Sequence, residues 1–278
     1  MTAAPDATLL RLEPGSPRQL SVLYAGAARR KGLGALYATE REIRSSLTAT
    51  SHEVAHVRQR FWREEVDRLV GGRPVHPLTQ AMRAAPGGAT LDFAPLHELL
   101  AATDLDLARF TYANRRELDA YAVRAGAAQR LAVTLLAEGR PLGAQAGVFA
   151  AALGRLLRQT ETLAALQSEA RAGRVYVPLE ELQGVGVDPT EVHRHPAPPA
   201  LLAWRRARAE ELSAELRAAA DPLSAGERRE LLPSLVLGAQ YSAWLGAIAA
   251  ADGHDVPLER VPTWRRVWAA WRSALRHG

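Results

Sequence analysis

The sequence of 278 residues contains no cysteine, only 6 % aromatic residues and a single lysine, Lys31. The lack of cysteine excludes disulfide bonds, thiol catalysis, iron–sulfur clusters and zinc sites built on cysteine. Aromatic and β-branched residues favour strands. Alanine and leucine, which favour helices, make up about a third of this chain. The composition therefore argues against an all-β fold and, at 47 % hydrophobic residues, against disorder.

Helical periodicity dominates the chain, and no polar linker or internal repeat divides it. A chain of this length can bury a large core. We therefore expect one all-α domain over residues 1–278, with a flexible segment at 1–16. The predicted helices are 17–30, 33–70 (as one helix or two), 92–104, 111–138, 142–171, 197–220, 224–251 and 260–276, with loops at 86–90 and 173–199.

Basic residues outnumber acidic residues by 35 to 30, which gives a formal net charge of +5 and an isoelectric point near 10.0. Nearly every base is arginine, and because arginine stays protonated to very high pH, a small excess raises the isoelectric point far. The chain has no dense basic run and no recognisable nucleic-acid-binding module, so no nucleic-acid partner is expected. Residues 1–20 lack the pattern of a signal peptide, and a cytoplasmic location is expected.

One uncharged segment, Leu231 to Ala251, is long enough to span a bilayer. It contains Pro233, Gln240 and several small residues, so its hydrophobicity is modest. We interpret it as a helix buried on all sides of a bundle, with a membrane span as the alternative.

The motif His52-Glu53-Val54-Ala55-His56 matches H-E-x-x-H, in which two histidines bind zinc and the glutamate acts as general base. A zinc site also needs a third ligand and an open position for water. No downstream carboxylate stands in a distinctive context. A zinc hydrolase using His52, Glu53 and His56 is therefore one alternative, and a surface helix that carries two histidines is the other.

A second set of motifs is spread in order along the chain. It comprises GLGALYA at 32–38, RQRFWREEV at 58–66, GRPVHP at 72–77, Asp106-Leu107, Tyr112, Glu117-Leu118, Tyr121 and GRVYVP at 173–178. Each motif is weak alone, but the ordered set resembles the squalene/phytoene synthase family over roughly residues 20–275. The resemblance implies the isoprenoid synthase fold, a large helical bundle around a central cavity. It also implies head-to-head joining of two prenyl diphosphates with magnesium.

The family holds magnesium with two D-x-x-x-D motifs, since carboxylates at i and i+4 share a helix face and magnesium prefers oxygen ligands. The resemblance places the first motif at Arg44, Ser45 and Thr48, and the second at Ala165 and Glu169. Only Glu169 is acidic. We therefore predict a non-catalytic or repurposed protein with no cofactor. The alternative is an active head-to-head prenyltransferase, for which magnesium is expected.

The ligand is expected to be a prenyl or other apolar molecule in the central cavity. The candidate ligand-binding residues are Arg41, Tyr121, Arg158, Glu161, Arg174, Tyr176 and Tyr241. For Arg158, a salt bridge to Glu161 on the same helix is an equally good interpretation as a role in ligand binding. A protein partner is the alternative, because the degenerate motifs and the stretch 60–77 resemble the branch of complex I assembly factors.

The segment 262–272 places Trp264, Trp268 and Trp271 on one helix face, among several arginines. Basic amphipathic helices with tryptophan bind anionic lipid, so a peripheral membrane contact is one interpretation. We favour the other, in which the tryptophan stripe packs on the bundle.

Overall fold

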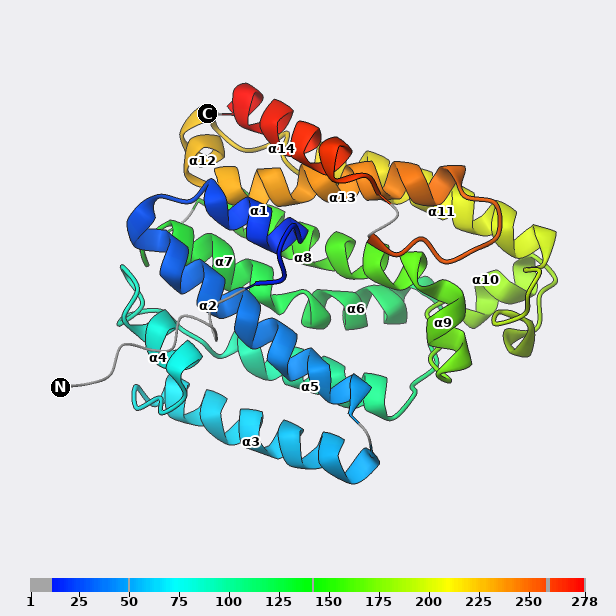
Figure 1. Ribbon diagram of the computed structural model, residues 1–278, viewed down its shortest axis with the longest axis horizontal. Coiled ribbons are helices and arrows are strands. Elements are labelled where there is room, and N and C mark those ends of the chain that lie inside the picture. The colour runs from blue at the N-terminus through cyan, green and yellow to red at the C-terminus, as the bar shows by residue number, and fades with distance from the viewer. Residues whose placement is uncertain (1–11, 50, 142, 259–260, 278) are drawn as a thin grey trace.

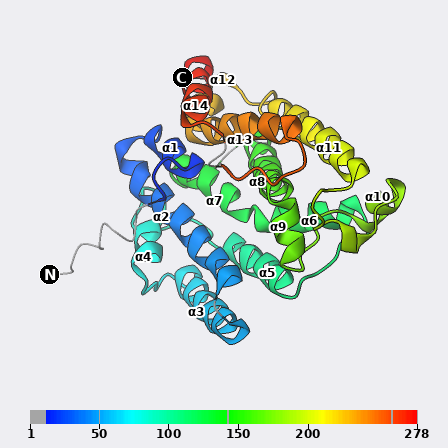
Figure 2. The same cartoon turned by 45° about the vertical axis from the view of Figure 1, so that its right-hand side comes forward.

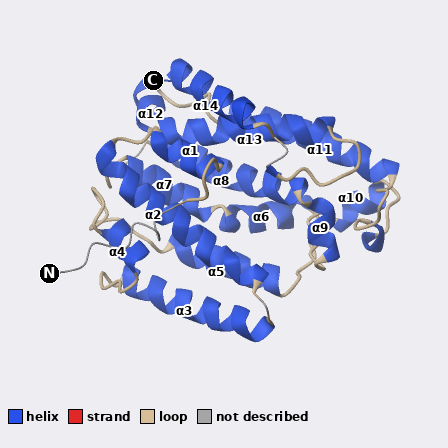
Figure 3. Ribbon diagram, viewed as in Figure 1, coloured by secondary structure: helices blue, strands red, loops and turns tan. Residues whose placement is uncertain are grey.

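The computed structural model describes residues 12–49, 51–141, 143–258 and 261–277, and this part of the chain folds into helices without any strand (Figure 3). The all-α prediction is confirmed. The helices are α1 (Pro17–Leu23), α2 (Ala27–Arg44), η1 (Ser45–Thr48), α3 (His52–Val70), α4 (Pro77–Arg83), α5 (Pro95–Leu107), α6 (Arg115–Ala125), α7 (Ala127–Leu136), α8 (Ala144–Ala164), α9 (Leu166–Arg171), α10 (Leu179–Gly184), η2 (Pro189–Glu191), α11 (Pro199–Ala218), α12 (Ala225–Glu230), α13 (Leu232–Ala250) and α14 (Thr263–His277).

Helix α8 forms the centre of the bundle and packs against α6, α7, α11 and α13 (Figures 1 and 2). On one side α2 packs against α1, α4, α5 and α7, and α3 covers the outside of this layer. On the other side α13 lies between α8 and α14, so α14 is the outermost helix of that face. The long helices α2, α8 and α13 therefore bring three distant parts of the sequence together in the interior.

Several predicted helices are interrupted. The structure divides each of the predicted helices 17–30, 111–138, 142–171 and 224–251 into two, and the predicted loop 173–199 contains α10 and η2. The segment 33–70 is divided between α2, η1 and α3, which agrees with its two-helix alternative. Gly26 is extended and starts α2, and Ser51 starts α3 by accepting a hydrogen bond from the Val54 amide. Gly126 separates α6 from α7. These capping and small residues offer the backbone an alternative to continuing the helix.

Two glycines allow the turn between α6 and α7 to touch α8. A Cβ atom on Gly154 would lie 2.2 Å from the carbonyl oxygen of Gly126, and a Cβ atom on Gly126 would lie 2.2 Å from the carbonyl carbon of Gly154. Only glycine permits so close an approach of two backbones. This crossing places the Ala125 carbonyl beside the interior charged groups described below.

The remaining fold predictions concern the N-terminal segment and the uncharged run 231–251. Of the expected flexible segment 1–16, residues 1–11 lie outside the described residues; Leu12 is buried, and Ser16 caps α1. The uncharged run 231–251 forms α13, which is buried along most of its length between neighbouring helices. None of the helices in the described part has the length and hydropathy that a bilayer span requires. The buried-helix interpretation of this run is confirmed.

Candidate functional site

Six charged side chains meet inside the bundle, and we call them the central network: Arg18, Glu40, Arg44, Asp106, Arg158 and Glu161. They come from α1, α2, α5 and α8. Their side chains are between 1 % and 21 % exposed. The network contains three arginines and three carboxylates, so its formal charge is zero. Buried charges of this kind are stable only when they are paired and hydrogen-bonded.

The local sequence explains how each helix presents these charges. Glu40 continues the buried stripe of α2 that includes Leu33, Leu36 and Tyr37, and Arg44 follows it one turn later. The α8 pair, Arg158 and Glu161, has the i, i+3 spacing that places two side chains on one face. From α8, Arg158 reaches Tyr121 of α6, and Glu161 reaches Arg18 of α1, which also bonds Glu40 of α2.

Arg18 joins α1 to both α2 and α8. Its guanidinium donates to Glu40 through Nε and Nη2, each at 2.9 Å, and to Glu161 Oε1 at 3.2 Å. Arg18 Nη1 also donates to the Tyr241 hydroxyl at 2.9 Å, and this hydroxyl donates to Glu161 Oε1 at 2.8 Å. One arginine therefore holds two carboxylates and a tyrosine of α13.

Arg158 joins α8 to a cluster of tyrosines. Its Nε donates to the Tyr121 hydroxyl at 2.7 Å, and its Nη2 donates to the Tyr176 hydroxyl at 3.2 Å and to Asp106 Oδ2 at 3.3 Å. The Tyr176 hydroxyl donates to Asp106 Oδ1 at 2.5 Å. The guanidinium also lies 5.6 Å and 5.3 Å from the ring centres of Tyr121 and Tyr176, within cation–π range.

The salt bridge from Arg158 to Glu161 is present, at 3.6 Å, but it is longer than the contacts with the tyrosines and Asp106. A salt bridge within the helix therefore accounts for only one of the contacts that the Arg158 guanidinium makes. Asp106, which was not among the sequence candidates, reaches Arg158 from α5 and is the nearer carboxylate, at 3.3 Å.

The pKa values of the network follow from these contacts. Burial alone would raise the pKa of the Glu161 carboxyl, but Arg18, Arg44 and Arg158, with the hydrogen bond from Tyr241, lower it to about 2. Burial raises the pKa of the Tyr176 and Tyr121 hydroxyls far above its usual range. At neutral pH the Glu161 carboxylate is therefore charged, and the Tyr121 and Tyr176 hydroxyls are neutral.

Arg44 is the least satisfied member of the network. Its Nη2 donates to the Ala125 carbonyl at 2.6 Å. Its Nε lies 3.5 Å from Glu40 Oε1 and has no hydrogen-bond partner among the described residues. The Gly126–Gly154 crossing positions that carbonyl, so the backbone of the α6–α7 turn takes part in neutralising this charge.

The other positions at which the resemblance expects aspartates lie around the network. Thr48 is exposed at the end of η1, and Ala165 follows the last residue of α8. Glu169 forms an ion pair with Arg174 at 2.5 Å. Within the described ranges no group of three or more histidine, aspartate or glutamate side chains is placed to hold a metal ion. The carboxylates nearest to these positions each already have an arginine partner, and the residues present do not fit a magnesium cluster.

The remaining sequence candidates lie apart from the network. Arg41 is on the exposed side of α2 and contacts Glu42 at 3.0 Å. His52 and His56 are exposed on α3, with ring centres 4.8 Å apart, and Glu53 is exposed beside them. No third metal ligand joins them in the part of the chain that the structure describes.

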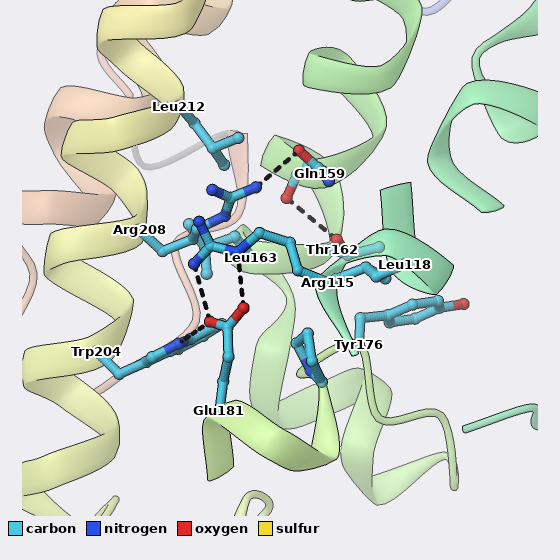
Figure 4. A pocket seen from close by; sticks show the side chains of 11 residues that line it. Arg115, Leu118, Gln159, Thr162, Leu163, Tyr176, Glu181, Trp204, Arg208 and Leu212 are labelled. Atoms are coloured by element: carbon cyan, nitrogen blue, oxygen red, sulfur yellow. Dashed lines mark hydrogen bonds and ion pairs between the residues drawn. The ribbon is translucent and has the colours of Figure 1, made fainter. Parts of the chain in front are cut away.

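A small pocket adjoins Tyr176 on the side facing α10 and α11 (Figure 4). It contains about 20 Å³, enough for about one water molecule. Its polar lining is already bonded: Arg115 donates to both oxygens of Glu181 at 2.8 and 3.1 Å, and the Trp204 indole donates to the same carboxylate at 2.6 Å. The pocket is therefore too small for an isoprenoid chain.

Arg18, Glu40 and Asp106 complete the network, and none was among the candidates from the sequence. Glu40 could have been found, because it precedes Arg44 by four residues and interrupts an apolar stripe. Arg18 and Asp106 reach the network from other helices, and their partners are far away in the sequence. By contrast, the structure does bring together the candidates Tyr121, Arg158, Glu161, Tyr176 and Tyr241.

Comparison with known proteins agrees with this arrangement of helices. The chain is 27 % identical over 132 residues to a phytoene synthase from Arthrospira platensis, covering 44 % of this chain and 43 % of that protein. It is 26 % identical over 180 residues to the chloroplastic phytoene synthase of Narcissus pseudonarcissus, covering 62 % of this chain and 42 % of that protein. The matches thus span less than half the length of these curated relatives.

Two solved structures share the fold. A dehydrosqualene synthase in complex with ligand superposes with a TM-score of 0.78 at 17 % identity, covering 98 % of this chain and 92 % of that chain. Squalene synthase HpnC from Alicyclobacillus acidocaldarius superposes with a TM-score of 0.67 at 20 % identity, covering 84 % and 87 %. The sequence profile described as squalene/phytoene synthase matches residues 13–272, nearly the whole chain. The chain therefore belongs to the squalene/phytoene synthase family.

Proposed function

We propose that this chain is a member of the family that does not catalyse the magnesium-dependent condensation and instead binds an isoprenoid or another lipid chain. One observation carries the first half of the proposal. Each carboxylate of the central network is paired with an arginine, and Arg44 stands where the resemblance expects a metal-binding aspartate.

The energetics of the network oppose metal binding. A magnesium ion would have to draw a carboxylate such as Glu161 away from its arginines. Separating one partner of a buried ion pair costs about 3–5 kcal/mol, because the other charge is left uncompensated. The arginines would also repel the cation. Without clustered metal, the departing diphosphate has little charge stabilisation.

The second half of the proposal is supported by a large groove on another face of the bundle. This open groove between α8, α11, α13 and α14 has a volume of about 850 Å³, within the range of about 300–1,000 Å³ that is usual for ligand sites. Its floor is apolar and includes Phe149, Leu153, Leu216, Leu235 and Ala243, whereas its α14 side is lined by Trp264, Trp268, Arg265, Arg272 and Arg276. A groove of this size and lining suits a hydrocarbon chain.

The runner-up is an active head-to-head prenyltransferase, which the names of the relatives favour. For that activity the central network would have to open and release its carboxylates. The resemblance to complex I assembly factors has no support from the relatives and structures named above, and the proposal does not depend on it. The zinc alternative would need a ligand beyond His52 and His56.

The catalytic half is tested by incubating the purified protein with farnesyl or geranylgeranyl diphosphate and magnesium, and analysing the extracted hydrocarbons. We expect the diphosphate to be recovered unchanged. A squalene-like or phytoene-like product that depends on magnesium would overturn this half. Titration calorimetry with magnesium alone provides the second readout, and we expect no binding heat.

The ligand half is tested separately by calorimetry with geranylgeraniol and with geranylgeranyl diphosphate in magnesium-free buffer. We expect binding without metal, weakened by Ala243→Phe, which fills the groove. Ala250→Phe is the matched control, because Ala250 is exposed on the same helix and does not line the groove. Absence of binding, or equal binding by the two variants, would overturn the ligand assignment while leaving the catalytic half standing.

A further inference from the structure

Helix α14 leaves its large apolar side chains largely exposed, and two of them, Trp264 and Trp268, also border the groove described above. Its buried residues are Arg266, Ala270 and Ser273. Its outward face carries the predicted tryptophan stripe: Trp264, Trp268 and Trp271 are 65 %, 52 % and 46 % exposed, with Val267 and Leu275 also exposed. The favoured sequence interpretation, in which this stripe packs on the bundle, is wrong.

A specific contact fixes this orientation of the helix. The buried Arg266 guanidinium donates to the Gly15 carbonyl and, at 3.3 Å, to the Thr263 hydroxyl. In the following turns the small buried residues Ala270 and Ser273 allow α14 to lie close to α13. Most surface helices bury their apolar stripe. Here the sequence uses arginine, alanine and serine for the inner face and leaves the aromatic face largely exposed, with Trp264 and Trp268 beside the groove.

The outward face is also strongly basic. Its exposed arginines are Arg265, Arg272 and Arg276, because Arg266 is buried on the inner face, and the helix contains no acidic residue. Among the described residues no carboxylate forms an ion pair with any of these four arginines; instead, Arg265 lies over the Trp264 ring at 5.3 Å. Burial, together with Arg228 and Arg276, lowers the pKa of the nearby His277, as expected in positively charged surroundings.

We propose that the outer face of α14 is a membrane-binding surface that lies on a bilayer containing anionic phospholipid. Tryptophan rings sit at the boundary between headgroups and acyl chains, because they combine a large apolar area with a polar N–H. The flanking arginines then meet the phosphates of anionic lipids, and each such contact adds to the attraction.

The charge of α14 favours a lipid surface over a second copy of the chain. A symmetric contact between two α14 helices would place arginines against arginines and supply no carboxylate to neutralise them. The position of the helix also suits a flat surface, because α14 lies along the outer edge of the bundle, with α13 beneath it (Figures 1 and 2). Trp264, Trp268 and the exposed arginines of α14 also line the groove, but the inference does not require a ligand in it.

The test is co-sedimentation of the full chain with vesicles of phosphatidylcholine alone and of phosphatidylcholine with phosphatidylglycerol. We expect binding to the anionic vesicles and a blue shift of the tryptophan emission, since the chain's other tryptophans, Trp62, Trp204 and Trp244, are buried or half-buried. Trp268→Ala with Trp271→Ala should weaken the partition on the order of tenfold. Val148→Ala, which removes an exposed apolar side chain from α8, is the matched control.

A second pair of variants tests how much the arginine charges contribute to vesicle binding. Arg272→Gln with Arg276→Gln should lower the partition about fivefold for each arginine removed, whereas Arg60→Gln on the exposed side of α3 should not change it. Equal binding to neutral and anionic vesicles, or no binding to either, would overturn the proposal. A different result would overturn the proposal in favour of dimerisation through α14. In that case light scattering would show a dimer of the original chain that the tryptophan variant does not form, and neither protein would bind vesicles.

Discussion

The central network and helix α14 place arginine in opposite situations. In the network, Arg18, Arg44 and Arg158 are balanced by three carboxylates and surrounded by tyrosine hydroxyls. In α14, four arginines share one helix with no acidic residue. The net charge of the protein is therefore not spread evenly: the interior is neutral by pairing, and the excess of base is concentrated where tryptophans are exposed. An isoelectric point alone reveals neither arrangement.

The two regions also suggest different reasons for using arginine. In the interior, the planar guanidinium can bond several acceptors at once, as Arg18 does with Glu40, Glu161 and Tyr241. On α14 the same group remains charged at any physiological pH and can pair with phosphates outside the protein. The interior arginines therefore stabilise the folded chain, whereas the exposed arginines of α14 can still form ion pairs with a binding partner.

The largest expected effect comes from removing an interior arginine. Arg18→Leu leaves Glu40 and Glu161 without their shared partner, and we expect the free energy of unfolding to fall by about 3–5 kcal/mol. Denaturant unfolding monitored by circular dichroism measures this change. Arg272→Leu on α14 is the comparison, with an expected change below about 0.5 kcal/mol.

A double variant shows whether the interior loss comes from the unpaired charge. Arg18→Leu combined with Glu40→Leu should recover part of the stability, because no uncompensated carboxylate remains at position 40. If the two losses simply added, pairing would not be the reason for the effect.

The second effect concerns pH. Because the pKa of Glu161 is lowered from 4.5 to about 2 in the folded state, its stabilising contribution is present above pH 4.5 and is lost as the pH falls towards 2. A shift of this size corresponds to about 3 kcal/mol at neutral pH. Unfolding measured from pH 6 down to about 2 should therefore lose stability more steeply for the original chain than for Glu161→Gln. Parallel curves for the two proteins would contradict this assignment.

Much of the fold could be predicted from sequence, because helical periodicity is a local signal. The exceptions were interruptions such as Ser51 and Gly126, where a cap or a close backbone contact stops a helix that the apolar pattern would continue. The outward orientation of α14 could not be read from its periodicity. The pattern identifies the apolar face, but the buried bond from Arg266 to Gly15 decides which face points inward.

The candidate site was predictable only in part. Arg158 and Glu161 share a helix, so their relation is visible in the sequence. Arg18 and Asp106 meet them only through tertiary packing, and both residue types are usually exposed. Charge pairing across helices has no sequence period, which is why the neutral network was not foreseen.

The third effect tests the backbone contact that supports the network. Gly154→Ala places a methyl group 2.2 Å from the Gly126 carbonyl oxygen, so α8 and the α6–α7 turn must separate. We expect a loss of about 2 kcal/mol in the free energy of unfolding. Gly147→Ala in the same helix is the control: nothing lies within 4 Å of its added methyl group, and it should gain up to about 1 kcal/mol. A neutral result for Gly154→Ala would mean that the crossing is looser than described.

The smallest change in the free energy of unfolding is expected for variants of α14, which contrast most clearly with variants of the central network. Trp268→Ala and Arg276→Gln, measured singly by thermal unfolding without lipid, should each change the free energy of unfolding by less than about 0.5 kcal/mol, since both side chains are exposed. Adding anionic vesicles should raise the unfolding temperature of the original chain more than that of either variant, because a partner that binds only the folded state stabilises it. A loss of several kcal/mol without lipid would show instead that the tryptophan face is part of the folded core, and the distinction between a paired interior and an unpaired surface would fail at α14.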